Sequence, residues 1–141
     1  FSLYRLFRRI RPHYLLSYTI KPVIYGSLCG WLSGVPKKYA LITGLGFAFQ
    51  GENRQRKFIN LLVRFMYRLA LLTVDKVFFQ NPDNKHLFIQ LGIIKDEPNK
   101  STVVNGSGVN LDSFSVKRLS KVPSFLLISR LLGDKGIREY V

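Results

Sequence analysis

The chain has 141 residues, 47% hydrophobic and 21% charged, and its 22 Lys and Arg against 8 Asp and Glu give a net charge of +14. Eleven Phe and seven Tyr supply enough apolar surface for a core, which excludes a disordered basic tail or a low-complexity sequence. The single cysteine, Cys29, excludes a disulfide framework and indicates a reducing compartment. No uncharged apolar stretch reaches the roughly 18 residues of a membrane-spanning helix.

Short apolar strands alternate with longer helical stretches, which is typical of an α/β protein with a Rossmann-like parallel sheet. Pro12 stops the first helix, and Pro22 falls near the first position of the second, where its missing N–H costs little. The first part of the sequence predicts a basic helix at 3–10, a buried strand at 13–18, a helix at 23–32 and a strand at 38–43.

A loop running to about Gln55 follows, after which the alternation resumes. Gly106 and Gly108 mark a turn that requires positive φ. The polar segment 117–123 is typical of a linker, and Gly136 leads into a new helix. The remaining predictions are a helix at 58–73, a strand at 76–80, a helix at 84–91 beginning at Asn81, Asp83 or Asn84, a strand at 102–105 and a buried strand at 124–129.

Arg130 and Lys135 follow the predicted strand at 124–129 and flank a glycine-containing turn. Ligands of open α/β sheets bind at the carboxyl ends of the strands, and these two cations suit a phosphate. The alternative interpretation is a solvated basic loop between a strand and a helix. The local sequence leaves both interpretations open.

Two further candidates lie at the carboxyl ends of other strands. Tyr18, Thr19 and Lys21 follow the first strand, and the small residues Gly44 and Gly46 follow the second, where backbone N–H groups can approach a ligand. Spacing alone favours an ordinary turn for the first group. A lone Gly-x-Gly is a weak signal for the second.

A cationic stripe marks the helix at 58–73 and the residues just before it. Arg54, Lys57, Arg64 and Arg68 fall within roughly 80° of arc on an otherwise strongly apolar helix. Together with the basic residues of the first helix, the stripe suits an anionic membrane surface. The alternative is a core helix with a solvated edge. The basic residues of the first helix are Arg5, Arg8, Arg9 and Arg11.

No catalytic constellation of a known kind is visible. His13 and His86 have no Cys, Asp or Glu at metal-ligand spacing, so no metal site is predicted. Asp75, ahead of a strand, is interpreted as structural. A nucleophile triad, a pair of catalytic carboxylates and a Walker loop are all missing from the sequence.

Four segments follow one another along the chain: P-H-Y-L-L-S-Y-T-I-K-P at 12–22, I-T-G-L-G-F-A-F at 42–49, V-N-G-S-G-V-N-L at 104–111 and F-L-L-I-S-R-L-L-G-D-K-G-I-R-E-Y-V at 125–141. In this order they resemble the bacterial glycosyltransferases of family 4, and most of all the branch that extends undecaprenyl-diphosphate-linked sugars in capsule, O-antigen and glycan assembly. This resemblance implies a GT-B fold, in which two Rossmann-like domains hold the acceptor and the nucleotide-sugar.

The resemblance also implies a domain organisation. Residues 1–121 are expected to be the later part of the acceptor domain plus the linker, and residues 122–141 the start of the donor domain. The family's E-x7-E carboxylate pair would lie beyond Val141. We therefore expect an internal segment of a longer chain and attribute activity to that parent only.

The resemblance implies that the sugar is transferred with retention of its anomeric configuration and that Arg130 and Lys135 stabilise the departing diphosphate. It also implies that no metal or cofactor is needed. Tyr18, Thr19 and Lys21 would line the acceptor side, with Lys21 near a lipid-linked diphosphate. Many relatives place a His in the loop after the second strand. Here that loop contains Gly44-Leu45-Gly46, so no catalytic His is assigned and the loop is expected to offer backbone donors.

The expected partners are a nucleotide-sugar donor, with UDP as the expected nucleotide, a lipid-linked acceptor and an anionic membrane. The expected location is the cytoplasmic face of the plasma membrane, as a peripheral protein. The alternative function is a noncatalytic basic module that binds membranes or nucleic acid. Nucleic acid is disfavoured because RNP, KH and zinc signatures are missing, and a dehydrogenase because a G-x-G-x-x-G fingerprint is missing.

Overall fold

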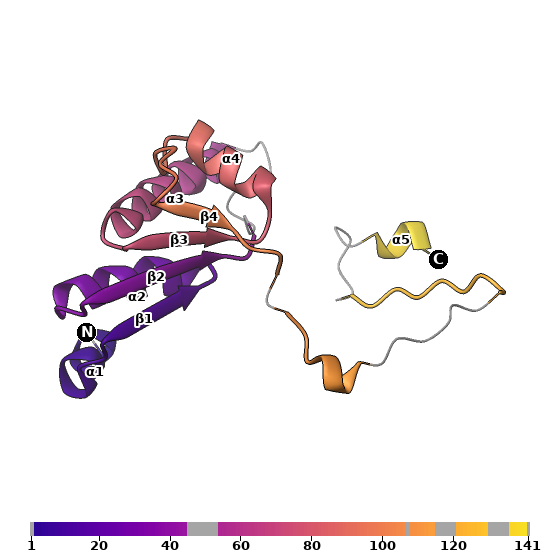
Figure 1. Ribbon diagram of the computed structural model, residues 1–141. Helices are drawn as coiled ribbons and strands as arrows, with labels where there is room; N and C mark the ends of the chain where they lie inside the picture. Colours follow the sequence, from indigo (N-terminus) through magenta and orange to yellow (C-terminus); the bar gives the residue numbers. More distant parts are fainter. Residues whose placement is uncertain (1, 45–53, 107, 115–120, 130–135, 141) are drawn as a thin grey trace. The chain divides into compact units, whose positions relative to one another are not determined.

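The computed structural model describes residues 2–44, 54–106, 108–114, 121–129 and 136–140. The chain divides into two compact units, Phe1–Gly108 and Val109–Val141. The first unit contains a four-stranded parallel sheet with the strand order β1-β2-β3-β4 (Figure 1). Its strands are β1 (Tyr14–Tyr18), β2 (Lys37–Ile42), β3 (Lys76–Phe79) and β4 (Ser101–Val103).

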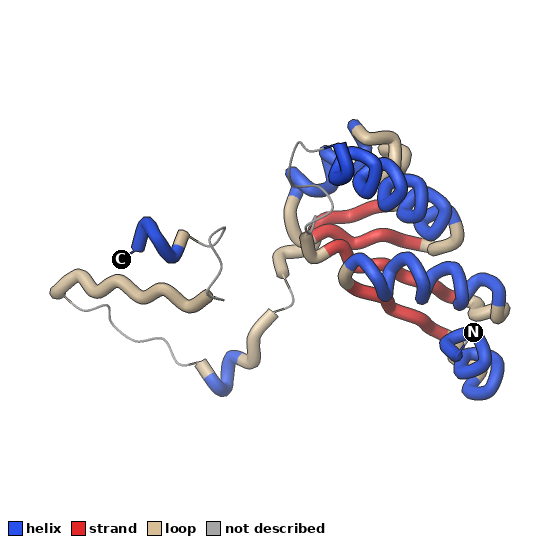
Figure 2. The backbone as a smooth tube through the Cα atoms, turned by 180° about the vertical axis from the view of Figure 1, so that it is seen from behind, coloured by secondary structure: helices blue, strands red, loops and turns tan. Residues whose placement is uncertain are grey.

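Helices α2 and α3 run side by side along one face of this sheet (Figure 2). The strand–helix alternation and the parallel pairing confirm the predicted Rossmann-like α/β class, as expected for part of a GT-B fold. The helices of the first unit are α1 (Ser2–Ile10), α2 (Ile20–Leu32), α3 (Arg54–Leu72) and α4 (Pro82–Gln90).

The core lies between the sheet and the helices. Along β2 the side chains of Lys38, Ala40 and Ile42 are buried and alternate with more exposed neighbours, as a strand with one covered face requires. The ring of Phe88 from α4 packs edge-on against Tyr67 of α3 and Phe79 of β3, with centroid distances of 5.2 and 5.3 Å. These aromatic contacts join both helices to the sheet.

Two helices begin earlier than the sequence predicts. Helix α2 starts at Ile20, so Pro22 occupies the third position of its first turn, where the backbone N–H has no partner within the helix in any case. Helix α3 starts at Arg54 rather than at residue 58.

Helix α4 begins after Asn81, whose side chain accepts a hydrogen bond of 2.6 Å from the N–H of Asp83.

Strand β1 was predicted to be buried, and this prediction is wrong. It lies at the edge of the described sheet, and Tyr14, Leu16 and Tyr18 are 71%, 56% and 59% exposed. Its other face packs against α2, where a Cβ on Gly26 would lie 2.5 Å from Ser17 Oγ. The apolar sequence of β1 therefore covers one packed face and one open face.

The second unit contains a 3₁₀ turn (Leu111–Ser113) and a short helix α5 (Ile137–Tyr140), which begins after Gly136 as predicted. The predicted buried strand at 124–129 is wrong for the structure described: this segment forms no strand, and Phe125, Leu126 and Ile128 are more than 80% exposed. A parallel strand needs a neighbouring strand to pair with, and the described residues of this unit supply none. The boundary near residue 121 stays a prediction.

None of the helices in the described ranges is long and apolar enough to cross a lipid bilayer.

Candidate functional site

The carboxyl ends of the strands meet at one edge of the sheet. Tyr18 is in register with Leu41, and Phe79 is in register with both Ile42 and Val103. The structure therefore brings the predicted residues after β1 to the same edge as Gly44, which follows β2.

Thr19 connects β1 to α2 with an unusual backbone conformation. Its φ and ψ angles are 68° and 163°, a region that a β-branched residue rarely occupies. It precedes the first residue of α2, yet its side chain makes no capping hydrogen bond. Among the described residues, the beginning of α2 therefore has no side-chain cap, and the backbone of Thr19 is strained.

The N-terminus of α2 is a cationic environment. The first intrahelical hydrogen bond runs from the N–H of Val23 to the carbonyl oxygen of Thr19 at 3.0 Å, so the N–H groups of Ile20 and Lys21 lie ahead of it. The first turn contains no acidic residue and contains the exposed Lys21. A Lys at this end adds to the positive end of the helix dipole, an arrangement that an anion would stabilise.

A shallow groove of about 440 Å³ leads away from this cation. Side chains of α1, β1 and α2 line it, and they include Leu16, Tyr18 and Tyr25. Lys21 is the only cation among its described lining residues. The groove and the α2 N-terminus together offer an apolar surface that ends at a positive charge, which suits an amphiphile with an anionic head.

The glycines of the second predicted group are only partly described. A Cβ added to Gly44 would meet nothing within 4 Å, so no neighbour in the described residues requires a glycine there. Gly46 lies outside the described residues, as do Arg130 and Lys135. Their roles in substrate binding and catalysis stay predictions.

Arg64 and Arg68 of the predicted cationic stripe have structural partners that the sequence analysis missed. Arg64 Nη2 donates a hydrogen bond of 3.1 Å to the carbonyl oxygen of Leu91, and Arg68 Nε donates one of 2.7 Å to that of Gly92. Both carbonyls belong to the turn that ends α4, where a helix leaves its carbonyl groups without intrahelical partners. The two guanidinium groups therefore hold α4 on α3. The only indication of these bonds in the sequence was Gly92, because a glycine that ends a helix indicates helix-end carbonyl groups in need of partners.

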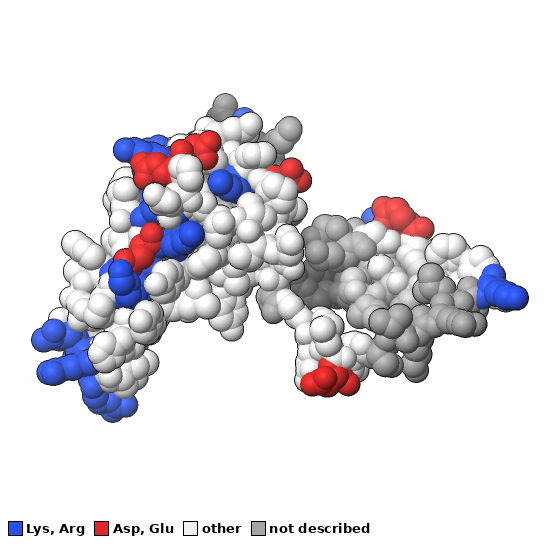
Figure 3. All heavy atoms as spheres, in the orientation of Figure 1, with Lys and Arg blue, Asp and Glu red and all other residues white. Residues whose placement is uncertain are grey.

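The other two members of the stripe are Lys57, which is exposed, and Arg54, whose backbone begins α3 and whose side chain lies outside the described residues. The role of the stripe at a membrane stays a prediction. Figure 3 shows a second group of Lys and Arg side chains over α1, where the predicted basic residues Arg5, Arg8 and Arg9 are exposed.

A large apolar surface on α3 bears on the two interpretations that the sequence left open for this helix, a membrane contact or a core helix with a solvated edge. Only part of the apolar sequence of this helix is buried, and the rest forms what we call the outer face of α3. Phe58 and Leu72, near its two ends, are 70% and 71% exposed. Side chains of this kind in contact with water indicate a binding surface. The outer face consists of Phe58, Ile59, Leu61, Leu62, Phe65, Leu69 and Leu72.

Asp75 has the structural role that the sequence indicates. Its Oδ2 accepts a hydrogen bond of 2.8 Å from the N–H of Lys38, and its Oδ1 lies 3.4 Å from Lys37 Nζ. The hydrogen bond from Lys38, followed by the interactions with Lys37, holds the pKa of this carboxyl below its ordinary value despite some desolvation. Asp75 thus joins the amino ends of β2 and β3, opposite the candidate site.

Within the described ranges, no cluster of three or more His, Cys, Asp or Glu is placed to hold a metal ion.

Comparison with known proteins identifies the family. Residues 1–81 match the family described as glycosyl transferase 4-like. The chain belongs to this family. It is also 24% identical over 154 aligned residues to the N,N'-diacetylbacillosaminyl-diphospho-undecaprenol alpha-1,3-N-acetylgalactosaminyltransferase of Campylobacter jejuni. That alignment covers 99% of this chain and 40% of the relative, so the chain spans about two fifths of the relative's length.

Proposed function

We propose that the protein containing this chain is a retaining glycosyltransferase that moves a sugar from a nucleotide-sugar to a polyprenyl-diphosphate-linked acceptor in surface polysaccharide or glycan biosynthesis. Membership of the glycosyl transferase 4-like family supports sugar transfer. The name of the Campylobacter jejuni relative, which includes a diphospho-undecaprenol acceptor, supports the substrate class. The observation in the chain itself that carries the proposal is the open N-terminus of α2 beside Lys21.

The acceptor diphosphate would bind at this N-terminus. The N–H groups of Ile20 and Lys21 and the Lys21 ammonium supply donors and positive charge, and the groove beside Tyr18 accepts the first apolar part of the lipid. Gly44 and Gly46, at the carboxyl end of β2, would approach the reacting sugar through their backbone N–H groups.

The donor diphosphate is assigned to Arg130 and Lys135. In the transfer, a hydroxyl of the acceptor bonds to the anomeric carbon of the donor sugar while the bond from that carbon to the nucleoside diphosphate breaks, so negative charge develops on the leaving diphosphate. Fixed cations next to that charge stabilise the transition state more than the ground state. Residues of the rest of the protein would complete the donor site.

We also propose that the protein is peripheral on the cytoplasmic face of the plasma membrane, with the outer face of α3 as its contact. Apolar side chains there, including Phe58 and Phe65, would enter the interface while Lys57 meets anionic headgroups. Membrane contact would bring the α2 N-terminus toward the plane of the lipid-linked diphosphate.

The direct test is transfer by the full-length protein. Purified protein is incubated with an undecaprenyl-diphosphate-linked sugar and a panel of UDP-sugars, and the lipid-linked product is analysed by mass spectrometry and by NMR of the new linkage. A lipid-linked disaccharide with the donor's anomeric configuration is expected. Failure with the whole panel, together with tight binding of nucleic acid, would support the noncatalytic basic module instead.

A further inference from the structure

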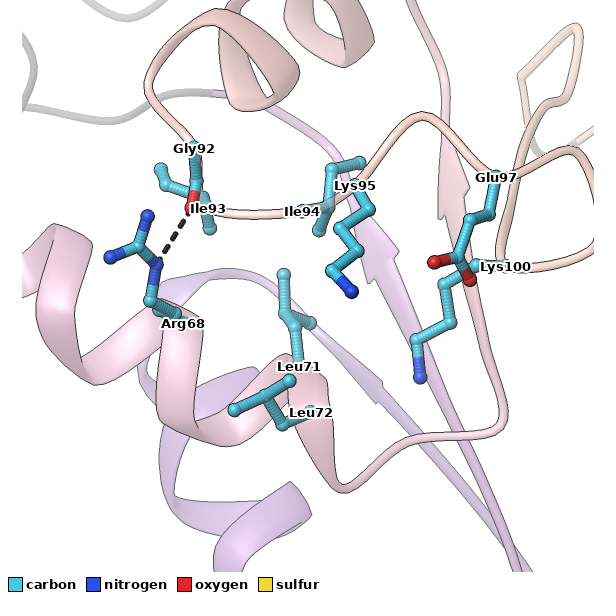
Figure 4. A pocket seen from close by; sticks show the side chains of 9 residues that line it. All are labelled: Arg68, Leu71, Leu72, Gly92, Ile93, Ile94, Lys95, Glu97 and Lys100. Carbon is cyan, nitrogen blue, oxygen red and sulfur yellow. Dashed lines mark hydrogen bonds between the residues drawn. The ribbon is translucent and has the colours of Figure 1, made fainter.

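A second cavity, of about 570 Å³, lies at the opposite edge of the sheet from the candidate site. The end of α3, the segment at 92–97 and the beginning of β4 form its walls (Figure 4). These are the amino ends of β3 and β4, whereas the acceptor residues Tyr18 and Lys21 follow the carboxyl end of β1. The proposed transfer reaction therefore leaves this cavity without a role.

The lining combines two kinds of surface. Leu71, Leu72, Ile93 and Ile94 form an apolar floor. Its cationic lining residues are Arg68, Lys95 and Lys100, against the single carboxylate of Glu97. A ligand that uses both surfaces must carry a negative group and an apolar chain, whereas inorganic phosphate would leave the floor uncovered.

The cations are placed by the backbone around them. Arg68 is held by its hydrogen bond to the carbonyl oxygen of Gly92, and Lys100 Nζ donates a hydrogen bond to that of Val74. Lys95 extends toward Leu71, and Lys100 lies farther along the cavity next to Glu97 (Figure 4). Partial burial lowers the pKa of Lys100, while Asp75 and Glu97 act in the opposite direction, and a further anion would add to the stabilisation of its charged form.

The position of Leu72 points to the source of such a ligand. This residue is the last of the outer face of α3, and it also lines the cavity. The apolar surface that we assign to the membrane thus continues into a cationic cavity. We propose that this cavity binds an anionic phospholipid, with the phosphate at Lys95 and Lys100 and the upper acyl carbons on the floor. This inference rests on the membrane contact of the proposed function and adds its lipid specificity.

The experiment uses the full-length protein and dioctanoyl phosphatidylglycerol below its micelle concentration, with binding measured by calorimetry. Dioctanoyl phosphatidylcholine has the same chains without net charge, and inorganic phosphate has the charge without chains. Binding is expected only for the phosphatidylglycerol. Lys95→Glu should weaken it about tenfold, since it removes a positive charge next to the lipid phosphate and adds a repelling negative one.

Matched control variants distinguish binding in the cavity from the effects of the overall charge and of the apolar surface of α3. Lys85→Glu, on α4 outside the cavity, changes the net charge equally and should leave the affinity unchanged. Leu72→Ser should weaken binding of the soluble lipid, whereas Leu69→Ser, on the same outer face but outside the cavity lining, should not. Both serine variants should reduce sedimentation with anionic vesicles, because both remove apolar membrane contact.

The proposal is overturned if phosphatidylcholine or inorganic phosphate binds equally well, or if Lys95→Glu and Lys85→Glu behave alike. It is also overturned if the wild type sediments with anionic vesicles but does not bind the soluble phosphatidylglycerol. If the membrane contact itself is wrong, the wild type will not sediment with anionic vesicles at all. Sugar transfer to a soluble acceptor analogue tests the enzymatic proposal independently of both.

Discussion

Arg68 Nε donates a hydrogen bond of 2.7 Å to the carbonyl oxygen of Gly92, and this bond joins the last turns of α3 to the end of α4. Gly92 has a φ of 61°, and a Cβ at this position would lie 2.6 Å from Arg68 Nη2. A residue predicted to face a membrane thus has a partner inside the protein. A charge reversal at Arg68 would lower the stability of the fold, so a loss of membrane binding in that variant could not be assigned to the membrane contact.

We expect Arg68→Ala to lower the free energy of unfolding of the full-length protein by about 1–2 kcal/mol, since it removes a charge-assisted hydrogen bond to a helix-end carbonyl. Urea unfolding followed by circular dichroism measures this change. Lys57→Ala, an exposed basic position on the same helix, is the control and should have little effect. Equal unfolding midpoints for both variants would contradict the structural role of Arg68.

The pH dependence of stability provides a test of Asp75. Its pKa is lower in the folded protein than in the unfolded chain, so the stabilisation is present above the ordinary carboxyl pKa and is lost as the pH falls through the folded value. We expect Asp75→Asn to be less stable than the wild type at pH 7 and to approach it at acidic pH. Thermal unfolding between pH 7 and pH 3 measures the difference, and a constant gap would refute this linkage.

Lys21 is the test of the acceptor site. We expect Lys21→Gln to raise the KM for the polyprenyl-diphosphate acceptor about tenfold and to leave the KM for the nucleotide-sugar unchanged, because one charge-assisted contact to the diphosphate is lost. Lys76→Gln, at the amino end of β3, is the control for the loss of one positive charge. A similar acceptor KM in both variants would remove Lys21 from the acceptor site.

The donor site is tested at Arg130 and Lys135. We expect Arg130→Ala and Lys135→Ala to lower kcat in the full-length enzyme by about two to three orders of magnitude, because each removes a cation from the charge that develops on the leaving diphosphate. Initial rates at saturating donor and acceptor separate this effect from weaker binding. Near-normal turnover in either variant would exclude that residue from catalysis.

The outer face of α3 is tested without touching its structural arginines. Phe65 is exposed on this face, and Phe65→Ser should weaken binding to anionic vesicles about tenfold, because a large apolar group no longer enters the interface. Leu32→Ser, at an exposed apolar position at the end of α2, is the control. Vesicle co-sedimentation measures both variants, and equal losses would place the membrane contact elsewhere.

Many features of the fold were predictable from local patterns. Proline and glycine positions marked the ends of helices, and the spacing of apolar residues indicated strands alternating with helices. The positive φ angles of Gly106 and Gly108, at 83° and 77°, agree with the turn predicted there. The residues after β1 were correctly placed at a strand's carboxyl end, because that position depends on element order alone.

Burial was harder to predict, because an apolar side chain looks the same in a sequence whether it faces a core or water. For this reason β1 was predicted to be buried, and the sequence left open whether α3 is a core helix or contacts a membrane. The exposed residues at 124–129 show the same difficulty: an apolar run predicts a strand, but a strand forms only where another strand pairs with it.

By itself, the sequence determined the α/β class, the order of the elements and the family to which the chain belongs, because these depend on local propensity and on motifs in sequence order. Tertiary structure alone decided that Arg64 and Arg68 hold the end of α4, and that Leu72 ends the outer face of α3 at a cationic cavity. Both relationships join residues more than 20 positions apart, and such contacts follow from the packing of helices on the sheet rather than from any pattern along the chain.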